Sequence, residues 1–225
     1  MKKHSTQLSL SEIANSDLRA AFILELFGLS FSDNGPMSLE QASEEAGIPI
    51  EYVRSTLSRY LDKDFNPEDT LTAILSNIVT VHHSFTWKVL PEIERLFEGI
   101  APGTDLEKAR DLFIKMAANI RNHSRDEEQR FFPRLRELEA TGIETLSVEE
   151  LEKELVNMED DHANCLGALK RLQILTGGYV IQDNDPPDYK LLMRLLRLLE
   201  FDLKVHIHKE NNLLHRKLEN LLEVK

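Results

Sequence analysis

The chain lacks several features that define large protein classes. It has one cysteine in 225 residues, which excludes an internal disulfide framework and fits a reducing compartment. It contains no run of about 18 apolar residues that could span a bilayer, and its first residues are not followed by the apolar core of a signal peptide. We therefore expect a soluble, cytoplasmic protein that does not act in a membrane.

Basic residues are also few. The sequence has 27 Lys and Arg residues against 39 Asp and Glu residues, which gives a formal net charge of −12. Such a charge repels a phosphate backbone and argues against nucleic acid as a partner. Apolar residues make up 41% of the chain, enough to fill the core of one large domain or of a bundle with a small companion.

The pattern of apolar residues predicts an all-α fold. Strand-like alternation is rare, and long stretches repeat apolar residues every three to four positions. A polar interruption at 62–69 divides the chain. Beyond it, residues 69–225 contain four amphipathic segments joined by short connections, which predicts an up-down-up-down four-helix bundle. These segments cover residues 70–99, 104–140, 147–175 and 188–222.

Residues 1–62 are predicted to form a small helical unit. Short helices flank the turn-rich stretch 30–36, and Ser38 opens a helix in the pattern of a capping box. A turn at Gly47 then precedes a helix over residues 51–61, in the rhythm of a helix-turn-helix. Because that second helix has few basic residues, we interpret the unit as a packing element in preference to a DNA reader.

Each of the four long segments carries a histidine on its inward stripe, and two of these histidines are followed four residues later by a glutamate. Residues four apart on a helix share one face, so each such pair offers an imidazole and a carboxylate to one point. Along the chain, His83 and His123 lie about 18 and 19 residues from the loop between them, so both sit roughly 28 Å from that end. Across the other two connections, the paired histidines also lie at distances from the loop that agree within about one helical turn. The candidate metal ligands are His83, His123, Glu127, His162, His206 and Glu210.

Burial cost favours coordination over simple core packing for this set. In the second segment, the apolar row Phe113, Met116 and Ile120 continues as His123 and Glu127. Ionisable side chains on a core stripe are costly unless they are paired or bound to metal. Finding six of them at one depth therefore predicts a metal site, in which a carboxylate could bridge two ions.

Several neighbouring residues are less clear from periodicity alone. The apolar stripe of the first segment leads to His82 as easily as to His83. We read Trp87 most simply as core or surface packing. His208 and His215 fall off the inward row of the fourth segment and are expected to be solvated.

The spacing and local motifs resemble the hemerythrin-like HHE cation-binding domain. More closely, they are similar to the di-iron proteins that repair damaged iron-sulfur clusters, also described as regulators of cell morphogenesis and nitric oxide signalling. The resemblance implies that His83 and not His82 is the first ligand, that Glu127 and Glu210 bridge the irons, and that the four histidines are terminal ligands. The motifs are Leu90-Pro91-Glu92 after His83, Glu127-Glu128-Gln129 before Phe132-Pro133, Met158-Glu159 before His162, and Glu210-Asn211-Asn212 after His206.

With this ligand set, the resemblance implies two iron ions joined by an oxo or hydroxo bridge, with manganese as the alternative metal. Two six-coordinate ions need about twelve bonds, of which the protein and the bridge supply about ten. Roughly one position per iron is left for a small ligand such as oxygen or nitric oxide. Mixed nitrogen and carboxylate ligation with open positions suits iron or manganese better than a closed zinc tetrahedron.

The resemblance predicts repair of iron-sulfur or other iron centres in client proteins under nitrosative or oxidative stress, and it leaves open whether the chain is an enzyme. The alternative is a sensor of oxygen, nitric oxide or redox state that signals through the N-terminal unit to a protein or DNA partner. One feature of the family is missing, because its Cys-Cys-Gly-Gly turn is replaced here by Ser32-Asp33-Asn34-Gly35. The thiol chemistry of that turn cannot be carried over, and we expect the unit to serve as a packing module or to form a homodimer.

Overall fold

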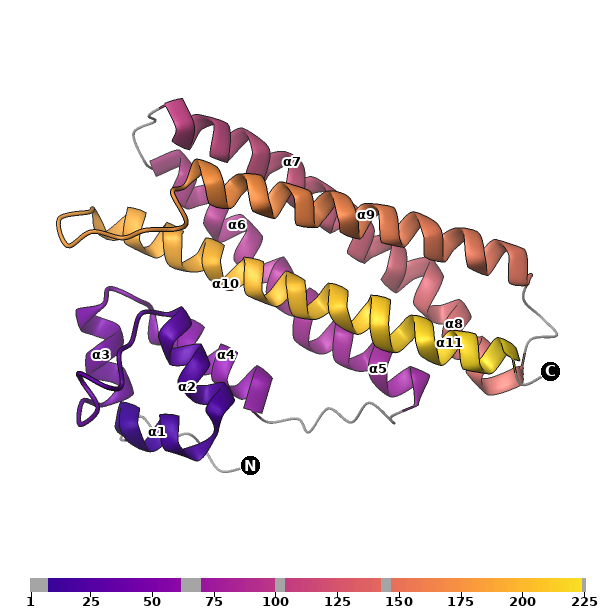
Figure 1. The fold of residues 1–225 in the computed structure, drawn as a ribbon, viewed down its shortest axis with the longest axis horizontal. Coiled ribbons are helices and arrows are strands. Elements are labelled where there is room, and N and C mark those ends of the chain that lie inside the picture. Colours follow the sequence, from indigo (N-terminus) through magenta and orange to yellow (C-terminus); the bar gives the residue numbers. More distant parts are fainter. Residues whose placement is uncertain (1–7, 62–69, 100–103, 143–146, 224–225) are drawn as a thin grey trace. The chain divides into compact units, whose positions relative to one another are not determined.

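A computed structural model describes residues 8–61, 70–99, 104–142 and 147–223. Helices account for nearly all of these residues, and no strand occurs among them (Figure 1). The β-type pairing found in this part of the chain is an isolated antiparallel bridge between Ser9 and Ser38. The predicted all-α fold is thereby confirmed. The polar interruption at 62–69 and the connection at 101–103 lie outside the described residues.

Contacts within the chain define two compact units. The first combines residues 1–65 with 181–198, and the second combines 66–180 with 199–225. The first unit contains four short helices and the beginning of a long one, α10. Their bounds are α1 Leu10–Ser16, α2 Leu18–Leu26, α3 Leu39–Glu45, α4 Ile50–Leu61 and α10 Pro187–Lys209.

Local hydrogen bonds explain where the helices of the first unit begin. Ser9 and Glu12 form a complete capping box, with the Ser9 amide donating to Glu12 over 2.8 Å and the Glu12 amide donating to the Ser9 hydroxyl over 3.2 Å. Ser38 and Gln41 repeat this arrangement at the start of α3, as the sequence predicted. Each box satisfies two amides that have no partner inside the helix.

The turn at residues 32–35, which has no cysteine pair, packs tightly against α1. The Ser11 amide donates to the Gly35 carbonyl over 3.0 Å. A Cβ atom placed on Gly35 would collide with the Ser11 hydroxyl and with the Phe31 carbonyl. Within the turn, the Ser30 hydroxyl donates to Asp33 over 2.7 Å. The turn is therefore held by backbone approach and polar side chains.

The second unit is the bundle. Three of its long helices each contain one π-helical segment, labelled η. In chain order the segments are α5 Leu71–Asn77, η1 Ile78–His83, α6 Ser84–Gly99, α7 Thr104–Asp126, η2 Glu127–Phe131, α8 Phe132–Thr141, α9 Val148–Leu175, the end of α10, η4 Glu210–Leu214 and α11 His215–Glu223. These bounds agree with the four predicted amphipathic segments to within about a residue at each end.

Contacts between the helices confirm the antiparallel order of the bundle. The start of the first long helix, α5, packs on the end of the second, α8, while α6 packs on α7 across the shared connection. The Glu139 carboxylate of α8 accepts hydrogen bonds from the Leu71 and Thr72 amides of α5 over 2.7 and 2.9 Å. In the next pair, α9 lies along α7 (Figure 1). Neighbouring helices therefore run in opposite directions.

The bundle core is apolar at both ends and polar in the middle. Phe113, Phe132, Leu199 and other large side chains are fully buried. Between these layers, seven ionisable side chains of the bundle are at most 4% exposed; they are His82, His83, Glu127, His162, Asp202, His206 and Glu210. Such a layer is costly without internal compensation, and it marks the functional region. None of the described helices combines the length and apolar character needed to cross a membrane.

Candidate metal centre

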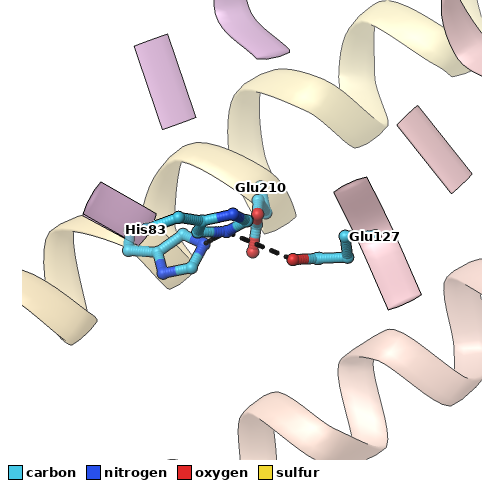
Figure 2. Close-up of side chains that lie close together, drawn as sticks. His83, Glu127 and Glu210 are labelled. Carbon is cyan, nitrogen blue, oxygen red and sulfur yellow. Dashed lines mark hydrogen bonds and ion pairs between the residues drawn. The ribbon is translucent and has the colours of Figure 1, made fainter. Parts of the chain in front are cut away.

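The bundle brings all six predicted ligands to one place. His83 ends η1, Glu127 begins η2, and Glu210 begins η4. The other three lie within α-helices, His123 near the end of α7, His162 in α9 and His206 near the end of α10. Figure 2 shows His83, Glu127 and Glu210 pointing toward one another from three different helices.

The six side chains form two groups that share both glutamates. The first group is His83, His206, Glu127 and Glu210, and the second is His123, His162, Glu127 and Glu210. Within each group the candidate ligand atoms lie within 4.8 Å of one another. The two histidines of a group also approach closely, with Nε2 to Nε2 distances of 3.3 Å for His83 with His206 and 3.1 Å for His123 with His162.

Each glutamate directs one oxygen to each group. Glu127 Oε2 faces His83 and its Oε1 faces His123, whereas Glu210 Oε1 faces His206 and its Oε2 faces His162. The distances from Nε2 to oxygen are 3.3 Å for His83, 3.1 Å for His123, 2.8 Å for His206 and 3.0 Å for His162. Both Glu127 oxygens and Glu210 Oε2 are buried without a hydrogen bond of good geometry to the described residues. A pair of bridged cations fits this donor set, because each cation would take two imidazoles and one oxygen from each carboxylate.

The π-helical segments lie at this cluster. All three of them contain a candidate ligand, whereas α9, which carries His162, stays α-helical. Such segments insert an extra residue into an α-helix and often occur at functional sites. After η2, Pro133 has no amide hydrogen to continue the α-helical bonding, which favours the wider turn that precedes it. The periodicity of the sequence did not predict these segments.

The outward nitrogens of three histidines are fixed by oxygen atoms. Such contacts set which nitrogen faces a metal and how the imidazole ring is oriented. The ring of His206 has no comparable partner for its Nδ1 among the described residues. The three pairs are His83 Nδ1 with Glu128 at 2.8 Å, His162 Nδ1 with Asn211 at 2.7 Å and His123 Nδ1 with Asp161 at 3.4 Å.

The adjacent histidines His82 and His83 are both fully buried but serve different purposes. His82 Nδ1 lies 3.2 Å from Asp202, and Lys209 Nζ lies 2.9 Å from His82 Nε2. Burial lowers the pKa of His82 to about 4, so Nε2 of the neutral ring can accept from the ammonium. The ring stacks on His206 with a centroid distance of 5.5 Å and an angle of 12°. His82 therefore packs against His206 and lies outside both groups of candidate ligands.

Burial and close contacts shift the protonation of the cluster in opposite directions. Burial lowers the pKa of His83, but close contact with the Glu127 and Glu128 carboxylates outweighs it and raises that pKa to about 10. For His123, burial again opposes protonation, and contact with Glu127 raises the pKa to about 9. Burial and the charge of Glu210 raise the pKa of Glu127, yet the nearby histidines hold it below its usual value. A metal ion must therefore displace protons from these histidines.

Two cavities reach the cluster from the sides of α7 and α9. The first has a volume of about 290 Å³ and touches His123, His162 and His206. Its wall is mostly apolar and includes Met116, Ile120, Cys165, Leu203 and Ile207. The second, of about 310 Å³, touches His123 and Glu127, and its wall combines polar side chains, such as Asn122 and Arg130, with the apolar Phe131 and Met158. Small molecules thus have room beside the ligands.

Sequence reasoning missed part of the surroundings. It expected His215 to be solvated, but this residue is only 8% exposed and its Nδ1 lies 3.1 Å from Glu159. His208 is exposed, as expected. The outer partner Glu128 directly follows Glu127, so a polar residue next to a ligand was the available signal. Asp202 lies one turn before His206 and could have been found by the same helical spacing.

Comparison with known proteins gives consistent results. The family model of the hemerythrin HHE cation-binding domain matches residues 73–219, which contain all six clustered side chains. The iron-sulfur cluster repair protein YtfE of Dickeya chrysanthemi is 24% identical over 219 residues, or 93% of this chain and 95% of that relative. The iron-sulfur cluster repair protein ScdA of Staphylococcus epidermidis is 22% identical over 171 residues, or 75% of this chain and 64% of that relative.

Proposed function

The chain belongs to the hemerythrin HHE cation-binding family, and we propose that it is a non-haem di-iron protein. His83 and His206 would hold one iron, and His123 and His162 would hold the other. Glu127 and Glu210 would bridge the two. The observation that carries this proposal is that each glutamate directs one oxygen to each pair of histidines.

The residues around the cluster would prepare it for small ligands. Glu128, Asn211 and Asp161 keep the Nε2 atoms of their histidines turned inward. The apolar cavity leads oxygen, nitric oxide or a related small molecule toward His123 and His162 and limits the access of bulk water. When bound, the iron pair would supply redox chemistry and about one open position per ion.

The biological role we propose is the repair of iron-sulfur or other iron centres under nitrosative or oxidative stress. Both relatives described above are named as iron-sulfur cluster repair proteins, and one of them aligns with 93% of this chain. The thiol pair expected in the N-terminal unit is replaced by Ser32 and Asp33. Any transfer of iron or sulfur would therefore depend on groups of the bundle.

A second candidate is a sensor of the same small ligands. The observation in its favour is the continuity of α10, which begins in the first unit at Pro187 and carries His206 in the second. A ligand-dependent shift of His206 could thus act on a helix that belongs to both units. A sensor would change its oligomeric state or partner affinity on binding nitric oxide, whereas a repair protein would restore a client.

The test is reactivation of an iron-sulfur hydratase that has been inactivated by nitric oxide. The iron-loaded chain should restore hydratase activity, and a His123→Ala, Glu127→Ala variant should not. An exposed-site variant, Glu107→Gln, serves as the matched control and should behave as the parent protein. If the loaded chain leaves the hydratase inactive but changes its own oligomeric state with nitric oxide, repair is excluded and sensing is favoured.

A further inference from the structure

One buried serine beside the cluster has a hydroxyl that the fold does not use. Ser124 directly follows His123 in α7 and is only 1% exposed. Its hydroxyl makes no hydrogen bond of good geometry in the part of the chain that the structure describes. A buried hydroxyl normally has a partner, because removing it from water without one is unfavourable. The position of Ser124 therefore calls for an explanation beyond packing.

Other buried hydroxyls in the helices show the usual solution. A serine or threonine in a helix can donate to the carbonyl three or four residues before it. Thr56, Thr86 and Thr176 are also buried, and each donates to such a carbonyl over 2.7, 2.9 and 2.8 Å, respectively. The Ser124 hydroxyl makes no such bond to its own helix. Its oxygen is therefore available to a group from outside the helix.

The hydroxyl and three proposed metal ligands face the same space. Ser124 lines the first cavity, of about 290 Å³, together with His123, His162 and His206. These histidines represent both groups of candidate ligands, because His206 belongs to the first group and the other two belong to the second. A small molecule that bound a metal from this cavity would therefore have the Ser124 hydroxyl in the wall around it.

The rest of this wall offers little hydrogen bonding at the same depth. Met116, Leu203 and Ile207 are buried and apolar. Cys165 is half-buried, and a thiol is only a weak donor. Among the described lining residues, Ser124 is therefore the buried polar group that is not itself a candidate ligand. The other polar residues of the wall are exposed; they are Asn119, Asp161 and Asn164.

We propose that Ser124 donates a hydrogen bond to the far atom of a small ligand held at the metal pair. The inference rests on the proposed di-iron function and names the class of ligand that the cavity selects. A hydroxyl donor interacts most strongly with an acceptor that carries negative charge. The cavity should thus favour small molecules that are anionic, or that draw electron density from iron on binding, over neutral apolar molecules of the same size. Ser124 touches the ligand and not the metal, and no bond is formed or broken by it.

A hydroxyl kept for a ligand should lower the stability of the metal-free protein. Ser124→Ala removes a buried group that has no partner among the described residues, and alanine is the better helix former. The variant should therefore be at least as stable as the parent in urea unfolding of chelator-treated protein. A clear loss of stability would show that the hydroxyl bonds inside the protein and would overturn its assignment to a ligand.

The binding experiment titrates azide into the iron-loaded, oxidised chain and follows the ultraviolet-visible absorption. Azide is the probe because it is a small linear anion with an acceptor nitrogen at its far end. Ser124→Ala is compared with the matched control Ser43→Ala. Ser43 in α3 is also 1% exposed, its hydroxyl also lacks a partner among the described residues, and it lines neither of the two cavities. Iron content is measured for every variant before the titration.

We expect Ser124→Ala to weaken azide binding by about tenfold or more, the change expected when one hydrogen bond to a charged group is lost. Its iron content and its spectrum without azide should stay those of the parent protein. The infrared stretching band of bound azide should move in heavy water for the parent, because the hydroxyl proton exchanges. That isotope shift should disappear in Ser124→Ala, whereas Ser43→Ala should match the parent in both affinity and isotope shift.

Failure of this inference and failure of the di-iron proposal give different results. If Ser124→Ala binds azide as tightly as the parent and keeps the isotope shift, another group holds the ligand, and the assignment is overturned while the metal centre stands. If the parent chain takes up no iron after anaerobic loading, both proposals fall. If it takes up iron but binds no azide, the centre has no open position, and the role of Ser124 falls together with the small-ligand function.

Discussion

In the metal-free protein, raising the pH should lower stability, which is the opposite of the usual behaviour of paired carboxylates. The contacts around Glu127 raise the pKa of His83 to about 10 and that of His123 to about 9, against an ordinary value of 6.5. Below about pH 6.5 both histidines are protonated in the folded and the unfolded chain, and their ion pairs stabilise the fold in full. As the pH rises toward about 9 to 10, that stabilisation is lost.

The size of the effect follows from proton linkage. Between about pH 7.5 and 8.5, each of the two histidines holds a proton in the folded chain that it has released in the unfolded chain. Each such proton changes the free energy of unfolding by about 1.4 kcal/mol per pH unit. Because His83 and His123 share the Glu127 carboxylate, about 3 kcal/mol per unit is the upper limit for the pair. That limit is a large part of the roughly 5 to 15 kcal/mol that stabilises a typical domain.

Urea unfolding of chelator-treated protein at a series of pH values measures this slope. Glu127→Gln removes the carboxylate that faces both histidines, so the slope should become shallower in that variant. Loading with ferrous iron should abolish the decline, because a metal requires neutral imidazoles and binds more tightly as the pH rises. A free energy of unfolding that stays level or increases between about pH 7 and 9 in the metal-free parent would refute the argument.

Three further predictions concern positions around the cluster. His82→Ala removes the neutral imidazole that contacts the fully buried Asp202 and should cost about 1 to 3 kcal/mol in urea unfolding. An Asp202→Ala, His82→Ala double variant that is no more stable than the single one would contradict this. Glu139→Ala removes two hydrogen bonds to the first amides of α5 and should cost about 1 kcal/mol, while the exposed Glu137→Ala on the same helix should cost almost nothing. Burial raises the pKa of Cys165 to about 12, so alkylation by iodoacetamide should be roughly a thousandfold slower than for a free thiol, and rapid labelling in a mass spectrum would show that the thiol is open.

The sequence was most informative about the helices, because their signals are local. The predicted capping residue Ser38 lies at a helix start in the structure, where its hydroxyl accepts from the Gln41 amide, and Ser147, the first residue of the third predicted segment, caps α9 in the same way. The second predicted segment ends at residue 140, and α8 ends one residue later, where Gly142 has a positive φ. Apolar periodicity then fixed which face of each long helix turns inward, and it brought the six candidate ligands to one depth.

The π-helical segments account for what periodicity could not predict. In the fourth helix, η4 covers Glu210–Leu214 and adds a residue to the turn before His215. The extra residue rotates everything after it, which carries His215 from the expected solvated face into contact with Glu159. A constant period of 3.6 residues contains no information about such an insertion.

Contacts between residues far apart in the chain could not be predicted from periodicity either. Periodicity left His82 and His83 equivalent, because both can face inward where the helix changes to η1. What separates them is the position of Asp202 and Lys209, residues of another helix more than a hundred positions away. The hydrogen bond between His83 and Glu128 likewise joins the first and second long helices and has no sequence signature of its own.

The measurement that tests the account most directly is the number of irons bound per chain after anaerobic loading, in the parent protein and in variants that separate the two groups of ligands. We predict about two irons for the parent, about one for a His83→Ala, His206→Ala variant whose second group stays intact, and fewer than one for Glu127→Ala, which removes a carboxylate shared by both groups. Binding of zinc in preference to iron, or loss of all iron when only His83 and His206 are replaced, would contradict a centre built from two bridged, separately held ions.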